Sequence, residues 1–113
     1  MRGSEAEERA RSWLEAQGLE LIARNWRCRG GELDLVMRDG AEVAIIEVRS
    51  RARADFGTAA ESVARHKQRR IVRAARLLLA QRPELAEQAV RFDVVALDGK
   101  DAVEWLRGAF DAE

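Results

Sequence analysis

Two apolar, β-branched runs on either side of Asp39-Gly40 constrain the fold more than any other part of this chain. The first is Gly31-Glu32-Leu33-Asp34-Leu35-Val36, and the second is Ile45-Ile46-Glu47-Val48-Arg49-Ser50-Arg51. An Asp-Gly pair between such runs is the strongest short-range signal for a β-hairpin. We therefore predict two antiparallel strands over 31–51, with acidic residues at positions where a core strand would carry Val or Ile.

The loop length decides which of these acids face one another. A two-residue loop at Asp39-Gly40 places Glu32 opposite Glu47 and makes Asp34 a diagonal neighbour of Glu47. Since side chains alternate between the faces of a strand, these three acids and Arg49 share one face. Like charges directly opposite each other destabilise a sheet, and two carboxylates can hold one Mg²⁺. The alternative is a half-exposed hairpin whose acids are only solvated.

Length and composition restrict the class of protein. The 113 residues suffice for one domain with a real core, so we expect a single domain over 1–113. No apolar run approaches the roughly 20 residues of a membrane span, and residues 1–8 contain no apolar signal core. We therefore expect a cytoplasmic protein without a membrane partner. Cys28 is the only cysteine, which excludes an internal disulfide and a Cys-rich zinc site.

Charge is distributed unevenly along the chain, although the net charge is zero. Residues 49–76 contain nine Lys or Arg and two acids, a net charge of +7, and the rest of the chain carries −7. A basic block beside an acidic pocket is what a metal site for phosphodiesters needs, whereas the other interpretation is a solvated helix face. The candidate nucleic-acid contacts in this block are Arg51, Arg69, Arg73 and Arg76.

The remaining segments complete an element order of α-β-β-β-α-β-β. Helical spacing predicts a helix over 5–17 and a longer one over 59–82, opened by the capping box Thr58-Ala59-Ala60-Glu61 and ended by Pro83. Strands are predicted over 19–26, 91–97 and 103–106, a short helical turn or loop over 83–89, and a loose end over 108–113. This order predicts an α/β fold with a mixed central sheet flanked by helices, in which the long crossover helix allows strands three and four to be parallel.

Three charged residues interrupt apolar stripes. Glu7 lies on the inward stripe of the first helix, either as a first-turn acid that complements the helix dipole or as an acid aimed at the pocket. Lys67 lies in the apolar stripe of the long helix, and either its stem passes the core or its ammonium group faces the acids. Asp93 lies within an apolar strand, where we expect it to pair with an arginine rather than bind metal.

Seven motifs occur together over nearly the whole chain: Gly3-x-x-Ala6-Glu7-x-x-Ala10, Trp13-Leu14 with Gly18, Arg24-Asn25-Trp26-Arg27-Cys28-Arg29-Gly30-Gly31-Glu32-Leu33-Asp34-Leu35, Glu47-Val48-Arg49-Ser50-Arg51, Phe56-Gly57, Ala64 through Lys67-Gln68, and Arg91-Phe92-Asp93-Val94-Val95. In combination they resemble the YraN family of small bacterial proteins, which is similar to the archaeal Holliday-junction resolvases and to the wider PD-(D/E)xK nuclease fold. The resemblance implies a restriction-endonuclease-like core.

The same resemblance implies roles for individual residues. It implies that Asp34 and Glu47 bind Mg²⁺ or Mn²⁺ with help from the backbone carbonyl of Val48. It favours Glu7 as an acid of the pocket, and Lys67 matches the basic residue that the family carries on its long helix.

Arg49 departs from the family pattern, which has lysine there, and it separates two hypotheses about function. In the nuclease mechanism that lysine orients or activates the attacking water, whereas arginine keeps the charge but does not release a proton near neutral pH. The first hypothesis is a metal-dependent endonuclease that cleaves nucleic-acid phosphodiesters, branched DNA among them. The second is a catalytically impaired nucleic-acid-binding module, and a weaker third is a scaffold for an acidic protein. By resemblance we expect DNA as the partner and a homodimer as the assembly.

Overall fold

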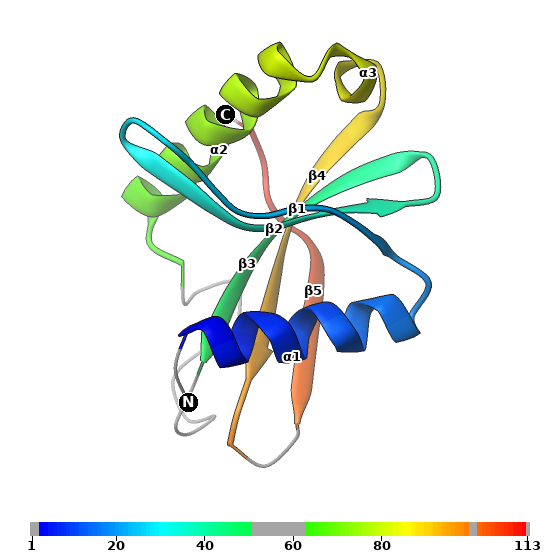
Figure 1. Cartoon of the computed structure of the whole chain (residues 1–113). Helices are drawn as coiled ribbons and strands as arrows, with labels where there is room; N and C mark the ends of the chain where they lie inside the picture. Colours follow the sequence, from blue (N-terminus) through cyan, green and yellow to red (C-terminus); the bar gives the residue numbers. More distant parts are fainter. Residues whose placement is uncertain (1–2, 51–62, 100–101, 113) are drawn as a thin grey trace.

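The computed structural model describes residues 3–50, 63–99 and 102–112, which form a five-stranded sheet with helices on both faces (Figure 1). In chain order the elements are α1 (Gly3–Ala16), β1 (Glu20–Cys28), β2 (Gly31–Asp39), β3 (Glu42–Ser50), α2 (Arg65–Gln81), α3 (Pro83–Ala86), β4 (Ala89–Leu97) and β5 (Val103–Phe110). The predicted order α-β-β-β-α-β-β is confirmed, and the short α3 falls in the segment predicted as a helical turn.

The strands lie side by side in their chain order, β1-β2-β3-β4-β5. Neighbouring strands are antiparallel except β3 and β4, which are parallel. Because β3 and β4 are parallel, the chain has to cross back between them to the end of the sheet at which β3 begins. Helix α2 lies on this crossover connection. The mixed sheet predicted from the long crossover helix is therefore confirmed.

Each face of the sheet is covered by one long helix. Helix α1 buries Ala6, Ala10 and Leu14 against one face, in a cluster with Leu35, Met37, Ala44, Ile46, Val95 and Leu97. Helix α2 covers the other face, where Ile71, Val72, Ala74, Ala75 and Leu78 pack on Leu33, Val36, Val43, Ile45 and Val94. Apolar side chains on both faces of β2 and β3 explain why these strands read as nearly continuous hydrophobic runs.

The hairpin between β2 and β3 forms as predicted, but its register differs by two residues. Asp39 pairs with Glu42, so the two-residue loop is Gly40-Ala41 rather than Asp39-Gly40. Gly40 has a φ of 61°, and a hairpin loop with glycine at its first position accommodates this conformation without a side-chain clash. Because side chains alternate with a period of two, a shift of two residues does not by itself turn a side chain to the other face of the sheet.

Helix α2 is shorter at its start than predicted. It begins at Arg65, and the preceding Ala64 is extended with φ −63° and ψ 152°, so the prediction of a helix from residue 59 is wrong for residues 63 and 64. The side-chain amide of Gln68 donates to the carbonyl of Val63 at 3.0 Å and satisfies an acceptor just before the helix. The capping box at 58–61 lies outside the described residues. The predicted end before Pro83 is confirmed.

The outer strands are longer than predicted. Strand β1 extends to Cys28, and β5 continues to Phe110, so the prediction of a loose end from Gly108 is wrong for residues 108–110. Phe110 pairs with Phe92 on β4, and their rings stack with centroids 5.3 Å apart. This contact between aromatic rings on neighbouring strands stabilises the last residues of β5 against β4.

Candidate functional site

Two acidic side chains from adjacent strands meet on the face of the sheet that α2 covers. Leu35 of β2 pairs with Ile46 of β3, so the next residues along the two strands are Asp34 and Glu47. They are direct rather than diagonal neighbours, which corrects the register expected from the sequence. Glu47 is 4% exposed, and Asp34 is half-buried and accepts a hydrogen bond from the backbone N–H of Val48 at 2.9 Å.

Crowding of these two carboxyl groups changes their ionisation. Burial and the neighbouring charge of Glu47 raise the pKa of Asp34 from 3.8 to about 7, against the hydrogen bond from Val48 and the charge of Lys67, which lower it. Desolvation disfavours the charged form of an acid, and a second carboxylate nearby disfavours it further. The pair therefore holds a proton near neutral pH unless a cation takes its place.

Two basic side chains contact the buried acid. The ammonium nitrogen of Lys67 on α2 lies 2.8 Å from Oε2 of Glu47, and a guanidinium nitrogen of Arg49 lies 3.8 Å from the same oxygen. Lys67 is 43% and Arg49 36% exposed, so both cations stand between the buried acid and solvent. The sequence is compatible with either orientation of Lys67, and in the structure its ammonium group faces Glu47.

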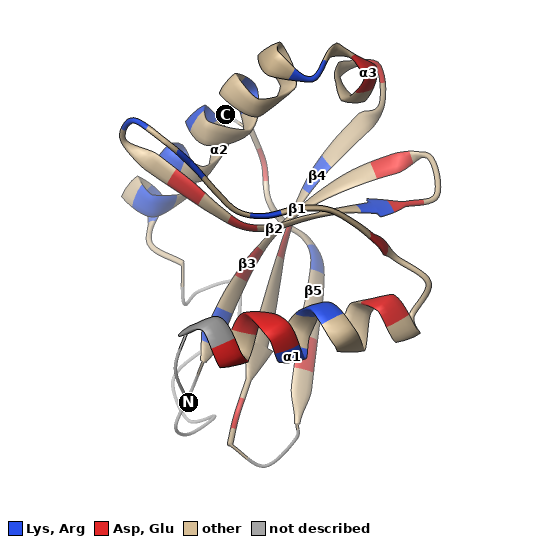
Figure 2. Ribbon diagram, viewed as in Figure 1, with Lys and Arg blue, Asp and Glu red and all other residues tan. Residues whose placement is uncertain are grey.

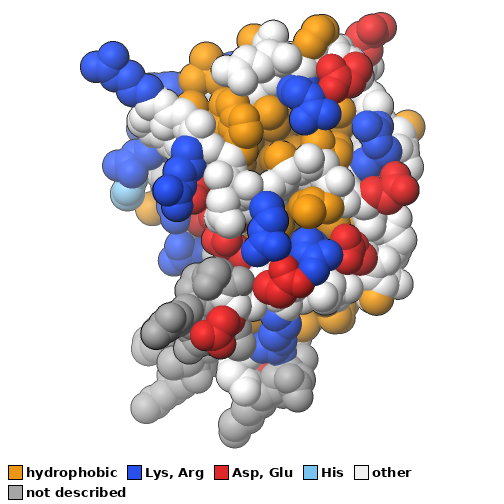
Figure 3. Space-filling view, viewed as in Figure 1, with side chains coloured by type: hydrophobic (Ala, Val, Ile, Leu, Met, Phe, Trp, Pro, Cys, Tyr) orange, Lys and Arg blue, Asp and Glu red, His pale blue; other side chains and the backbone are white. Residues whose placement is uncertain are grey.

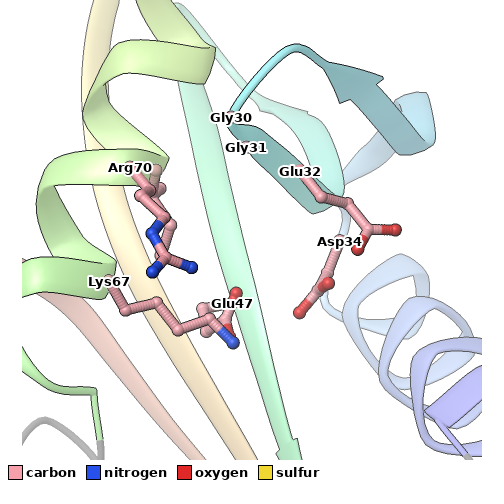
Figure 4. Close-up of a pocket in the computed structure, with 8 residues that line it drawn as sticks. Gly30, Gly31, Glu32, Asp34, Glu47, Lys67 and Arg70 are labelled. Carbon is pink, nitrogen blue, oxygen red and sulfur yellow. The ribbon is translucent and has the colours of Figure 1, made fainter.

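Asp34, Glu47 and Lys67, but not Arg49, line one hollow of about 220 Å³ between the β1–β2 turn and α2. Figure 4 shows acidic side chains reaching into it from the strands and basic side chains from α2. Its lining consists of Gly30, Gly31, Glu32, Asp34, Glu47, Lys67, Arg70 and Ile71. Among the described residues, no carboxylate lies within ion-pair distance of Arg70. Arg70 was not among the predicted site residues, and its position in the basic block was the only sequence signal for it.

Close packing between the β1–β2 turn and α2 fixes one wall of this hollow. A Cβ atom on Gly31 would lie 3.0 Å from the backbone oxygen of Arg70 and 3.3 Å from Cβ of Ala74. Only glycine lets the two backbones approach this closely. The β1–β2 turn therefore packs directly against α2 at Arg70, the residue whose side chain enters the hollow.

Glu7 on α1 interacts electrostatically with Asp34 and Glu32 of β2. Burial raises the pKa of Glu7 above its ordinary value, the charge of Asp34 adds to the rise, and a hydrogen bond from the Asn25 side chain opposes it. Glu7 is not among the residues that line the hollow, and its role as an acid of the pocket stays a prediction.

Glu32 and Asp93 have partners of their own. Glu32 is 41% exposed and accepts a hydrogen bond from Arg27 at 3.1 Å. Asp93 is fully buried and accepts hydrogen bonds at 3.0 Å from Arg91, from the Trp105 indole and from the backbone of residue 108. The prediction that Asp93 pairs with an arginine is thereby confirmed.

The predicted nucleic-acid contacts of α2 lie outside the acidic hollow. They are exposed and line a second hollow of about 200 Å³, formed by Arg69, Val72, Arg73, Arg76 and Ala112. Arg76 donates a hydrogen bond to the carbonyl of Ala112 at 3.1 Å. Figure 2 shows Lys and Arg positions in blue along α2 and Asp and Glu positions in red on the strands, and Figure 3 shows Lys and Arg side chains on the left of the same view. Arg51 lies outside the described residues, and a role in nucleic-acid binding stays a prediction for all four arginines.

The donor atoms at the acid pair fit a hard divalent cation. In the described part of the chain, no three His, Cys, Asp or Glu side chains converge as a metal cluster, which argues against a zinc site with three or four protein ligands. Mg²⁺ and Mn²⁺ accept carboxylate oxygens, and Mg²⁺ usually keeps several waters and uses only one or two carboxylates. Asp34 and Glu47 supply two such carboxylates. Val48 contacts Asp34 through its backbone N–H, and the role of its carbonyl as a metal ligand stays a prediction.

No helix within the described ranges combines the length and the apolar character needed to span a membrane. This result agrees with the absence of a long apolar run in the sequence.

Comparison with known proteins gives consistent matches over most of the chain. The model of a family described as "Uncharacterised protein family UPF0102" matches residues 6–97. A UPF0102 protein of Halorhodospira halophila is 52% identical over 112 residues, covering 99% of this chain and 88% of that protein. UPF0102 proteins of Pseudomonas putida strain GB-1 and Dechloromonas aromatica are 49% and 47% identical, covering 96% and 99% of this chain and 92% and 90% of their own lengths. This chain therefore belongs to the uncharacterised protein family UPF0102.

Proposed function

We propose that this protein is a metal-dependent endonuclease that acts on nucleic-acid phosphodiesters. The observation that carries the proposal is the buried pair Asp34 and Glu47, which faces Lys67 and Arg70 across one hollow. Paired acids next to basic side chains suit an anionic ligand that binds together with a cation, where the cation bridges the acids and the ligand. A phosphodiester with Mg²⁺ or Mn²⁺ has that chemistry.

Asp34 and Glu47 are the residues that would hold the cation, with the carbonyl of Val48 as the resemblance implies. A bound cation would supply Lewis acidity toward the phosphate and a lowered pKa of a bound water. The basic side chains have separate tasks. Lys67 and Arg49, already close to Glu47, are placed to stabilise charge that develops on the phosphate.

Arg70 extends into the hollow from α2 (Figure 4), and its guanidinium group can grip two phosphate oxygens at once. The outer arginines of α2 would hold the nucleic-acid backbone without reading bases. We propose DNA as the nucleic acid, including branched DNA, and a homodimer as the active assembly.

A second function is a nucleic-acid-binding module with impaired catalysis, and Arg49 is the observation that favours it. Arg49 ion-pairs with Glu47 at 3.8 Å, and arginine stays protonated at neutral pH. It supplies charge but no proton acceptor, and its planar group occupies more space than an ammonium group. A misplacement of about 1 Å in such a site can lower a rate on the order of a hundredfold.

Metal binding tests the site shared by both functions. Thermal unfolding of the wild type should shift upward with Mg²⁺ or Mn²⁺, since a ligand that binds only the folded state stabilises it by about 2.7 kcal/mol at a hundredfold excess over Kd. The shift should vanish in Asp34→Asn combined with Glu47→Gln. Glu20→Gln combined with Glu87→Gln, which alters exposed acids that do not line the hollow, is the control and should retain it. An equal shift in both double variants would exclude the acid pair as the metal site.

Cleavage decides between the two functions. Single-turnover assays on labelled linear and four-way-junction DNA with Mg²⁺ or Mn²⁺ should show weak wild-type activity that rises in Arg49→Lys. The double carboxylate variant is the blank. Metal-dependent binding without cleavage by either protein would support the binding module instead. Robust wild-type cleavage that falls in Arg49→Lys would show that arginine itself serves the reaction.

A further inference from the structure

Helix α2 and the chain at the end of β5 form the two walls of a groove outside the acidic hollow. The C-terminus lies beside α2 in Figure 1, and two hollows lie between these walls. The first is the hollow of about 200 Å³ that the outer arginines of α2 line with Val72 and Ala112. The second has a volume of about 280 Å³ and is lined by Arg65, Gln68, Ala109, Phe110 and Asp111. Because the two linings are consecutive in sequence on both walls, the hollows form one α2–β5 groove.

The helix wall of this groove carries a row of like charges. Arg65, Arg69 and Arg73 are exposed and follow one another at intervals of four residues, so they lie on one face of α2. Within the described ranges, no carboxylate forms an ion pair with any of the three. Like charges at this spacing destabilise a helix. A polyanion that binds along the row would offset their repulsion.

The second hollow has a different chemistry because it contains an aromatic ring and an acid. Phe110 is partly buried, and its ring stacks on Phe92 with centroids 5.3 Å apart and an interplanar angle of 22°. Phe92 is 5% exposed and belongs to the core, so it holds the ring of Phe110 in place. The carboxylate of Asp111 would repel a bare phosphate, whereas the amino group of a nucleobase can donate to it. This hollow therefore suits a base, and the arginine hollow suits phosphates.

We propose that the α2–β5 groove binds a single DNA strand, with phosphates at the arginines and one base stacked on Phe110. The inference deepens the proposed function and rests on it for the choice of DNA. Bases of a duplex are paired and stacked on each other, so only an unpaired base can stack on the ring. From Arg65 to Arg76 the helix rises about 16 Å, which equals about five nucleotides at about 3.4 Å each. Stacking on an aromatic ring tolerates any base, so the groove holds a strand without reading its sequence.

Arg73 connects this groove with the acidic hollow. A Cβ atom on Gly30 would lie 3.7 Å from a guanidinium nitrogen of Arg73, and Gly30 lines the acidic hollow. A strand bound at Arg73 therefore lies next to the β1–β2 turn and can continue toward Asp34 and Glu47. The substrate class that follows is DNA with an unpaired strand next to the bond that is cut.

Binding measured without metal tests the groove separately from catalysis. Fluorescence anisotropy in EDTA compares three labelled probes, which are a short oligothymidylate, an abasic strand of equal length and a duplex. Phe110→Leu keeps apolar bulk against Phe92 and removes the aromatic face, so it should weaken oligothymidylate binding by about 5-fold or more. It should leave the affinity for the abasic strand and for the duplex unchanged. Phe110→Trp should retain the wild-type affinity for oligothymidylate.

A matched control and a second readout accompany these variants. Leu77→Ala removes an apolar side chain of α2 that is 42% exposed and does not line the groove, and it should bind all three probes as the wild type does. In NMR spectra of the wild type, the ring signals of Phe110 should move upfield with oligothymidylate and stay in place with the abasic strand. This comparison needs no substitution and therefore does not depend on how a variant folds.

Several outcomes would overturn the inference. They are oligothymidylate affinity unchanged in Phe110→Leu, an equal loss for the abasic strand, and Phe110 ring signals that do not respond to bases. A poly-glutamate peptide that binds the groove as tightly as oligothymidylate would indicate an acidic protein as the occupant instead. The proposed endonuclease fails on different evidence, namely the absence of metal-dependent cleavage, and the anisotropy and NMR results would stand in that case.

Discussion

Replacing Asp34 by Asn should stabilise the metal-free protein at alkaline pH while it abolishes metal binding. Asn keeps an oxygen that can accept the hydrogen bond from the Val48 N–H, but it carries no charge beside Glu47. The substitution therefore removes the repulsion between the two acids without removing the backbone contact. A site arranged to bind a cation is expected to destabilise the empty fold in this way.

The magnitude follows from the pKa of Asp34, which is raised from 3.8 to about 7 by burial and by the charge of Glu47. A shift of about 3 units at about 1.4 kcal/mol per unit corresponds to about 4 kcal/mol. Because Asp34 is only half-buried and solvent screens part of the interaction, we expect about 2 kcal/mol. The folded state binds the proton more tightly than the unfolded state, so the wild type loses this stability as pH rises from about 4 to about 7.

Urea denaturation in EDTA at pH 4.5 and pH 8 measures the effect. The free energy of unfolding of Asp34→Asn should exceed that of the wild type by about 2 kcal/mol at pH 8, and the two proteins should converge at pH 4.5. Glu32→Gln, which changes an exposed acid two residues away, should stay within about 0.5 kcal/mol of the wild type at both pH values. If Asp34→Asn is less stable than the wild type at pH 8, or the difference is the same at both pH values, repulsion within the acid pair is refuted.

Three further substitutions test other parts of the structure. Lys67→Met removes the cation that lies 2.8 Å from buried Glu47, so it should lower the free energy of unfolding in EDTA by about 1–3 kcal/mol and tighten Mn²⁺ binding. Weaker Mn²⁺ binding in calorimetry would contradict the idea that the ammonium group and the metal compete for Glu47. Arg91→Met leaves fully buried Asp93 without its ion pair and should cost about 3–5 kcal/mol in urea denaturation, and Asp93→Leu in the same chain should recover part of that stability. Replacing the outer arginines of α2 by Ala should weaken DNA binding for all sequences alike. It should also reduce the slope of log K against log salt by about 0.9 for each duplex phosphate that is no longer bound. Arg82→Ala, beyond the end of α2, is the control and should leave that slope unchanged. The outer arginines replaced are Arg69, Arg73 and Arg76.

The alternation of side chains along a strand made the central part of the site predictable. Asp34, Glu47 and Arg49 share one face for any hairpin loop with an even number of residues, because the side-chain period is two. The register was wrong by two residues, and a shift of two still leaves Asp34 and Glu47 lining the same hollow. Burial of the acids was not predictable in the same way, since the hairpin pattern alone also fits solvated carboxylates.

Contacts between distant segments depend on packing that local patterns do not encode. Helix α2 had to dock over the β1–β2 turn, with Gly31 against its backbone, before Lys67 could reach Glu47 and Arg70 could enter the hollow. The left-handed conformation of Asn25 likewise appears only in the folded chain.

The sequence by itself determined the α/β class, the element order and the face on which the acids lie, because strand and helix periodicities are local properties of the chain. Only the tertiary structure decided which cations neutralise Glu47, how close Glu7 comes to Asp34 and where α2 begins. Those outcomes depend on contacts between residues far apart in the sequence, whose geometry is set by how two helices pack on opposite faces of one twisted sheet.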